Sequence, residues 1–247
     1  MKVLAVETST MLGGVAVIDN SAGLIAEVRL NVKSTHSERL MTEIDHILKQ
    51  SGLEISEIDV FAVSIGPGSF TGLRIGLSTV KGFSFATGKP IVAIPTLEAL
   101  AGSLPYCRYP VCTLLDARKK EVYAALFLWE GKGFVRIIDE VSININKLLE
   151  KIGANDTPSP AFTQWREKGF SDENVLFTGE GALLYKEIIR EAMGEKAILL
   201  SPEKMVPSPA NVASMGMQKA LRGEFSEPVS LIPFYIRRSE AEIKRKG

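Results

Sequence analysis

The sequence has little of the residue types that mark several common protein classes. Only 2 of the 247 residues are cysteine and 2 are histidine, so neither a disulfide framework nor a four-ligand zinc site is expected. Cys107 and Cys112 are therefore predicted to be plain buried thiols. No run of about 18 uncharged apolar residues occurs, and the apolar stretch before Glu7 is too short for a signal peptide. We expect a cytoplasmic protein with no membrane span.

Net charge is also absent. Lys plus Arg number 29, as do Asp plus Glu, so no global field draws the chain to nucleic acid or to an anionic membrane. Any contact with RNA must be local, or be made by a partner. The composition is 45% hydrophobic and 23% charged, which is typical of a globular protein.

What is present is an order of elements that occurs twice. The first half predicts strands at 3–6, 15–18 and 24–30, a helix at 36–50, a strand at 60–64, a helix at 70–86 and a strand at 91–94. The second half repeats three strands, helix, strand, glycine turn and helix between 111 and 193. This repetition predicts α/β architecture with two tandem domains. In each, the three leading strands are antiparallel and the later ones are parallel.

We place the domains at residues 1–102 and 103–247, with a C-terminal tail that is able to pack back on the first domain. Residues 229–236 are predicted to form an edge strand, because that segment contains Pro233. Residues 154–174 are predicted to be a surface insertion. The basic residues Arg237, Arg238 and 244–246 are interleaved with acids and are expected to be a solvated tail.

The most informative segment is Gly66-Pro67-Gly68-Ser69-Phe70-Thr71-Gly72-Leu73-Arg74-Ile75-Gly76. Its spacing of four places glycines on one helix face, although a glycine inside a helix costs about 1 kcal/mol relative to alanine. Close approach of another backbone, a bound phosphate or packing within the chain would each justify that cost. The segment lacks the lysine of a Walker loop, which favours the contact of one helix with another.

The first strand of each half ends in an acid. Glu7, with Ser9, Thr10 and Gly13, resembles the acid and hairpin phosphate loop of the actin-like ATPase superfamily, and Asp116 is the symmetric acid. A Mg²⁺-nucleotide site would require the second carboxylate, so these five residues are candidates for weak nucleotide binding. The alternative is that each acid is a solvated cap at a strand end.

The two histidines do not predict a metal site. On a helix, His36 and His46 lie roughly 15 Å apart, and Leu40 stands where a zinc helix would carry its second histidine. No nucleophile elbow or Ser/His/Asp set is recognisable. A metallopeptidase is therefore disfavoured, and we expect neither catalytic nor metal-binding residues.

Several motifs together resemble one bacterial family. They are Glu7-Thr8-Ser9-Thr10, His36-Ser37-Glu38, the glycine-rich segment 66–76 with Thr79-Val80-Lys81-Gly82, Asp116-Ala117-Arg118 with Glu121-Val122-Tyr123, and Pro233-Phe234-Tyr235-Ile236-Arg237. Over nearly the whole chain these are similar to the TsaB (YeaZ) family of bacterial tRNA threonylcarbamoyladenosine biosynthesis proteins. The resemblance implies two actin-like (RNase H-like) domains, and a scaffold that lacks the metal ligands of its catalytic paralogue.

The resemblance also implies partners. They are a second copy of the chain as a homodimer, a metal-bearing threonylcarbamoyltransferase (TsaD-like), an ATPase subunit (TsaE-like) and, indirectly, tRNA modified at adenosine 37 when it reads codons that begin with A. It implies no cofactor beyond ATP or ADP at low affinity or at the partner interface. The alternative is an autonomous ATP-dependent small-molecule phosphotransferase that uses Glu7 and Asp116.

A stripe on the helix at 70–86 predicts where the partner binds. Steps of four, three and four residues align Gly72, Gly76, Thr79 and Phe83, and small residues let a second helix approach closely. We expect homodimerisation through this helix and the preceding one, with the catalytic paralogue competing for the same surface. The expected interface comprises His36, Leu40, Ile44, Gly72, Arg74, Ile75, Gly76, Thr79 and Phe83.

Overall fold

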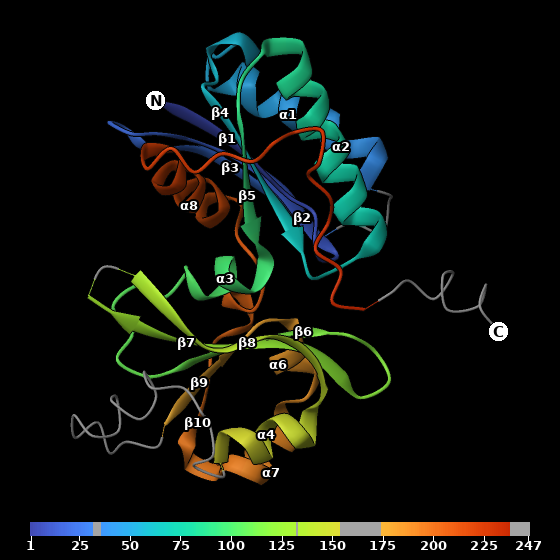
Figure 1. The fold of residues 1–247 in the computed structure, drawn as a ribbon, viewed down its shortest axis with the longest axis vertical. Helices are drawn as coiled ribbons and strands as arrows, with labels where there is room; N and C mark the ends of the chain where they lie inside the picture. The colour runs from blue at the N-terminus through green and yellow to red at the C-terminus, as the bar shows by residue number, and fades with distance from the viewer. Residues whose placement is uncertain (32–35, 132, 154–173, 238–247) are drawn as a thin grey trace, which may run out of the picture. The chain divides into compact units, whose positions relative to one another are not determined.

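The computed structural model describes residues 1–31, 36–131, 133–153 and 174–237, and it divides into two compact units (Figure 1). The first unit combines Met1–Ala99 with Pro207–Tyr235, and the second combines Leu100–Val206 with the segment that starts at Ile236. The sequence-based division placed the boundary at 102/103 and allowed a C-terminal tail to pack back on the first domain. In the structure the segment Pro207–Tyr235, which includes a whole helix, packs with the first unit. The two units are described separately below.

The first unit is built on a five-stranded sheet in the order β3-β2-β1-β4-β5. Its elements are β1 (Lys2–Glu7), β2 (Leu12–Asp19), β3 (Gly23–Asn31), α1 (His36–Gln50), β4 (Val60–Gly66), α2 (Phe70–Thr87), β5 (Ile91–Pro95) and α8 (Pro209–Leu221). Helix α3 (Thr96–Ala101) spans the boundary between the units. Strands β1, β2 and β3 pair antiparallel, whereas β1 with β4 and β4 with β5 pair parallel.

The second unit repeats this topology. Its elements are β6 (Val111–Asp116), β7 (Glu121–Glu130), β8 (Gly133–Asn144), α4 (Ile145–Gly153), β9 (Val175–Thr178), α6 (Glu180–Leu184), α7 (Lys186–Met193) and β10 (Ala197–Leu199). The strand order, β10-β9-β6-β7-β8, is that of the first unit in reverse, and the two parallel pairings again involve the last two strands. The predicted class, α/β with two tandem actin-like (RNase H-like) domains and mixed sheets, is confirmed.

Both faces of the first sheet are covered. Leu4 and Val6 of β1 pack in a cluster with α1 and α2, whereas Val3 and Ala5 pack in a cluster with α8. Successive side chains of a strand point to opposite faces, so the continuous apolar run of β1 is explained by helices on both sides (Figure 1). The need to cover the second face is the physical reason why α8 belongs to the first unit.

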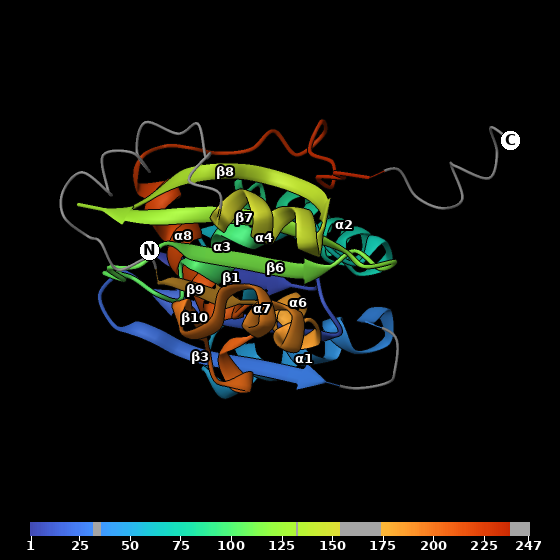
Figure 2. The same ribbon diagram turned by 90° about the horizontal axis from the view of Figure 1, so that it is seen from below.

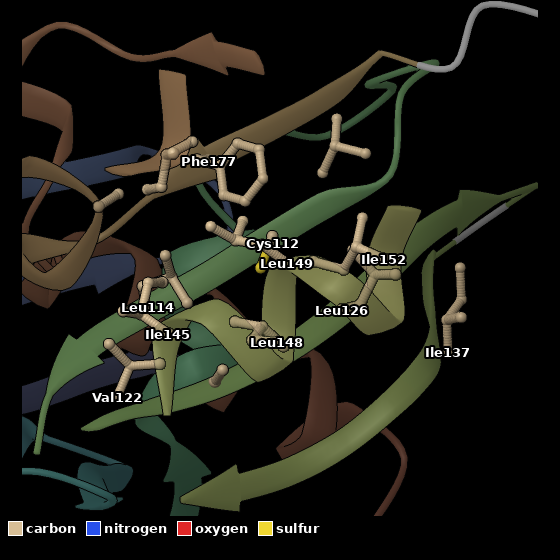
Figure 3. Packing of buried hydrophobic residues seen from close by; sticks show 14 of the residues in the cluster. Cys112, Leu114, Val122, Leu126, Ile137, Ile145, Leu148, Leu149, Ile152 and Phe177 are labelled. Carbon is tan, nitrogen blue, oxygen red and sulfur yellow. The ribbon is translucent and has the colours of Figure 1, made fainter. Parts of the chain in front are cut away.

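Helices α4 and α7 lie side by side against the second sheet (Figure 2). Cys112 of β6 is buried in this core beside Leu149 of α4 (Figure 3). Burial raises the pKa of the Cys112 thiol far above its usual range, so the group stays protonated. Both cysteines are free, but Cys107 is only half-buried, so the prediction of two buried thiols is correct for Cys112 alone.

The predicted edge strand at 229–236 is wrong. The segment forms no strand, and the backbone bridge to the edge strand β5 is made before it, between Ser226 and Ile91. Pro228 and Pro233 lack the N–H groups that a ladder requires. The insertion at 154–174, except for Asn174, and the basic residues after Arg237 lie outside the described part of the chain. No helix in the described ranges is long and apolar enough to cross a membrane.

A half-buried carboxylate joins β3 to the start of α8. Glu27 Oε1 accepts hydrogen bonds from Ser208 Oγ (2.6 Å) and from Ala210 N (3.1 Å), and Arg29 Nε lies 3.0 Å from the same oxygen. Burial alone would raise the pKa of Glu27, but the bonds from Ser208, Arg29 and Ala210 outweigh it and lower that pKa. The ionised form therefore caps the amino end of α8 from a different element.

We expect Glu27→Gln to destabilise the first unit by about 1–2 kcal/mol, because an amide cannot supply the charge that Arg29 and the helix end favour. Since the folded pKa of Glu27 is depressed, the wild type gains this stability above the unfolded value of 4.5 and loses it as pH falls through the folded value. Thermal melting as a function of pH measures both effects. Asp45→Asn, which removes only an exposed pair with Lys49, serves as control and should change stability little. Equal melting of the two variants would contradict the capping role.

Candidate functional site

The candidate site of the first unit lies where β1 ends and α2 begins. Glu7 is 0% exposed. Its Oε1 accepts hydrogen bonds from the backbone N–H of Ser9 (2.6 Å) and from the Ser9 hydroxyl, and its Oε2 accepts one from the Ser64 hydroxyl. Burial raises the pKa of Glu7, and the hydrogen bonds from Ser64 and Ser9 oppose that rise.

Glu7 is therefore not a solvated cap at a strand end, so that alternative is wrong for this acid. Its carboxylate is enclosed by hydroxyl and amide donors of its own chain, and Ser9, Thr10 and Gly13 are buried as well. A Mg²⁺ ion or a phosphate could reach Glu7 only if these bonds were exchanged. Nucleotide binding at these residues stays a prediction.

Asp116, the symmetric acid, belongs to the second unit. It is half-buried, and its Oδ1 accepts a hydrogen bond from Arg118 N (2.9 Å) and a long one from the Tyr185 hydroxyl (3.5 Å). Asp116 is thus more open than Glu7. Within the described ranges, no group of three or more His, Cys, Asp or Glu side chains is arranged to hold a metal ion.

The glycines of α2 face the end of β1 in the same chain. A Cβ added to Gly72 would lie 2.0 Å from the carbonyl oxygen of Thr8, and one added to Gly76 would lie 2.3 Å from Thr8 Oγ1. Two hydrogen bonds join the same elements: Thr8 Oγ1 donates to Gly72 O (2.8 Å), and Ser69 N donates to Ser9 O (2.7 Å). The close approach is therefore internal, which corrects the expectation that these glycines admit a helix of a second molecule.

The other expected interface residues divide by burial. Leu40 and Ile44 are 6% and 2% exposed and belong to the core of the first unit, so they are not surface contacts. Ile75, Thr79 and Phe83 are half-buried, and the Phe83 ring stacks on Phe61 at 5.6 Å. The side chain of His36, at the start of α1, lies outside the described part of the structure.

Two exposed apolar residues on these helices were missed. Met41 of α1 is 52% exposed and Phe85 of α2 is 93% exposed. Both fall outside the apolar stripes that face the core. An apolar residue on the otherwise polar face of a helix is the sequence signal that could have identified them. With Arg74 and Ser78, which are also exposed, they define the outer face of α1 and α2. A partner interface on this outer face stays a prediction.

The C-terminal segment meets the start of α2. The Tyr235 ring stacks on Phe70 at 4.5 Å, and Arg74 Nε donates a hydrogen bond to the Tyr235 hydroxyl (2.8 Å). Phe234 N donates to Ile65 O (2.7 Å). Gly66 has φ of +116°. A Cβ added to Gly66 would lie only 2.7 Å from the carbonyl oxygen of Phe234, so the absence of a side chain makes room for that carbonyl. The glycine-rich segment 66–76 and the C-terminal motif at 233–237, which are far apart in the sequence, are thus in contact.

Sheet topology, duplication and this strand-to-helix junction define a tandem α/β protein of the actin-like class. The comparisons agree with this class. The family model described as "TsaD: tRNA N6-adenosine threonylcarbamoyltransferase" matches residues 24–245. The chain therefore belongs to this family, within its TsaB (YeaZ) group.

Two curated relatives carry the description "tRNA threonylcarbamoyladenosine biosynthesis protein TsaB". The protein of Bacillus subtilis (strain 168) is 28% identical over 99% of this chain and 97% of its own length. That of Escherichia coli (strain K12) is 26% identical over 100% and 99%. Among solved structures, YeaZ from Pseudomonas aeruginosa superposes with a TM-score of 0.74 at 23% identity, covering 95% of this chain and 100% of that one, which supports the fold.

We expect Gly72→Ala to destabilise the first unit by roughly 3 kcal/mol, because the Thr8 carbonyl leaves no room for a Cβ. A larger residue, as in Gly72→Trp, should then impair folding rather than association alone. The matched control is Gly82→Ala on the same helix, where nothing lies within 4 Å of an added Cβ. That control should gain about 0.5–1 kcal/mol. Chemical denaturation measures both, and equal shifts would contradict the internal approach.

We expect Glu7→Gln to remove a pH-dependent loss of stability. Because the folded pKa of Glu7 is raised, the unfolded chain releases its proton first, and stability falls as pH rises from 4.5 through the folded value. Melting curves of wild type and variant across this range should diverge as pH rises, in favour of the variant. Glu150→Gln changes an exposed acid and is the control. Parallel wild-type and Glu7→Gln profiles would show that Glu7 does not titrate in this way.

Proposed function

We propose that this chain is a noncatalytic scaffold subunit in the biosynthesis of threonylcarbamoyladenosine in tRNA. In this role it binds and supports the metal-bearing catalytic paralogue, a TsaD-like threonylcarbamoyltransferase, which modifies adenosine 37 of tRNAs that read codons beginning with A. Membership in the TsaB (YeaZ) group supports participation in this pathway. The cytoplasm is the expected site of such a reaction.

The observation that carries the noncatalytic assignment is the enclosure of Glu7. Metal-assisted phosphoryl transfer requires carboxylates that reach Mg²⁺, whereas this carboxylate is fully buried among donors from Ser9 and Ser64. The same feature disfavours the alternative, an autonomous ATP-dependent phosphotransferase that uses Glu7 with Asp116. In this proposal the chain binds ATP or ADP only weakly, or at the interface with a partner, and does not turn the nucleotide over.

The outer face of α1 and α2 is the proposed partner surface. It exposes Met41 on α1 and, along α2, Arg74, Ser78 and Phe85, and exposed apolar anchors among polar residues are typical of protein interfaces. The proposed occupants are a second copy of the chain and the catalytic paralogue, which compete for the surface. The ATPase subunit (TsaE-like) completes the complex. The substrate of the whole complex is tRNA.

We expect Met41→Asp and Phe85→Asp, made separately, to weaken both homodimerisation and capture of the purified catalytic paralogue at least tenfold, because a charge replaces an apolar anchor. Both side chains are exposed, so the melting temperature should change little. Light scattering, pull-down and thermal melting measure the three quantities. Leu184→Asp in the second unit replaces another exposed apolar residue and should leave association intact.

The purified chain alone should neither hydrolyse ATP nor modify tRNA, and it should restore modification when added to its partners. Robust modification or phosphoryl transfer by the chain without partners would overturn the scaffold role and favour the phosphotransferase. Full partner capture by both interface variants would instead place the surface elsewhere on the molecule.

A further inference from the structure

The turn that joins β6 to β7 in the second unit holds three consecutive basic residues in the left-handed region. Arg118, Lys119 and Lys120 have φ of 64°, 55° and 60°. L-residues with a Cβ are disfavoured there, and glycine or asparagine is the usual occupant. Backbone outliers that persist in a fold cluster at functional sites, so the turn requires an explanation.

The backbone of this turn is fixed from the protein side. Lys120 O accepts hydrogen bonds from Ile145 N (3.2 Å), at the start of α4, and from Asn144 Nδ2 (3.3 Å). Ala117 O accepts one from Arg237 Nη1 (3.1 Å). These donors hold the carbonyl groups inward, while the side chains of Arg118, Lys119 and Lys120 are all exposed.

The acids beside the turn are already engaged. Glu121 Oε2 lies 2.8 Å from Arg237 Nη1, and Asp116 Oδ1 accepts the N–H of Arg118. In the described part of the chain, no carboxylate lies within 4.0 Å of the charged groups of Arg118, Lys119 or Lys120. The chain has equal numbers of basic and acidic residues, yet this exposed turn gathers three cations that have no ion-pair partner among the described residues.

We propose that the turn formed by Arg118, Lys119 and Lys120 binds phosphate groups of an RNA backbone. This inference rests on the proposed function, in which the RNA is tRNA, and it adds a direct contact where only an indirect one was expected. Lysine and arginine bind backbone phosphates without reading sequence. Because the three cations stand side by side on an open turn, they suit the repeated charges of a polyanion. Glycine at these positions would relieve the backbone strain but would supply no positive charge.

The test separates charge from backbone strain. We expect the double variant Lys119→Gly, Lys120→Gly to melt at or above the wild-type temperature, because glycine suits these φ values. Its affinity for an unmodified tRNA transcript should fall roughly tenfold, and the slope of log affinity against log salt should fall by about one per removed cation. Lys119→Arg, Lys120→Arg keeps both charges and should retain binding.

The matched control is Lys151→Ala, Lys186→Ala, which removes two exposed lysines from α4 and α7 of the same unit. Filter binding of the full-length chain over a range of salt concentrations provides the measurement. Unchanged affinity and salt slope in the double glycine variant, an equal loss in the control, or no binding of the transcript by the wild type would each overturn the proposal. Loss of ATP binding with tRNA binding intact would also overturn it and would assign the turn to free nucleotides.

Capture of the catalytic paralogue keeps the two proposals apart. The glycine variant should capture the paralogue as the wild type does, because the outer face of α1 and α2 is unchanged. If the wild type captures no paralogue, the scaffold role fails, while the transcript binding curves still decide whether this turn binds RNA.

Discussion

The contact between the end of β1 and the start of α2 is the constraint on which the first unit depends. Thr8 lies so close to Gly72 and Gly76 that no side chain fits between strand and helix. The same junction places Ser9, whose amide and hydroxyl engage Glu7, and whose carbonyl accepts the amide of Ser69. Buried polar groups need hydrogen-bond partners. The small glycines let the strand end approach the helix, and that same strand end supplies donors that satisfy the buried Glu7 carboxylate. The consequence is that α2 has a fixed position relative to β1, with its outer face left exposed.

The second unit meets the same constraint with different residues. A Cβ on Gly179 would lie 2.0 Å from the carbonyl of Leu114, and one on Gly181 would meet the Leu114 backbone at 3.1 Å. Gly179 also has φ of +103°, which glycine tolerates best. These glycines are two residues apart, whereas Gly72 and Gly76 are four apart. The topology therefore repeats where the sequence barely does, because the fold requires a small residue at the junction but does not specify its spacing.

This difference explains which features the sequence could predict. The shared order of strands and helices and the strand directions follow from apolar periodicity and turn residues, which are local, and they were correct in both units. The short elements α3 and β10 were not predicted, and the strand predicted at 229–236 does not form. The spacing of Gly72 and Gly76 identified a close approach, but periodicity does not say what approaches. Leu40 and Ile44 likewise carry the signature of a buried stripe, whether the stripe faces the core or a partner. The placement of α8 could not be predicted either, because it depends on the uncovered second face of a distant sheet.

The two strand-end loops show how duplicated folds diverge. In the first unit, Thr8, Ser9 and Thr10 are buried, and Ser9 donates hydrogen bonds to Glu7, the acid that ends β1. At the corresponding place in the second unit, Arg118, Lys119 and Lys120 are exposed beside the acid that ends β6, on a backbone that disfavours them. The first loop is buried and satisfies its acid from within the chain, whereas the second accepts strain and keeps its charges in solvent. Substitutions readily remove backbone strain that brings no functional benefit. The strained, charged turn of the second unit is therefore the stronger candidate for contact with another molecule.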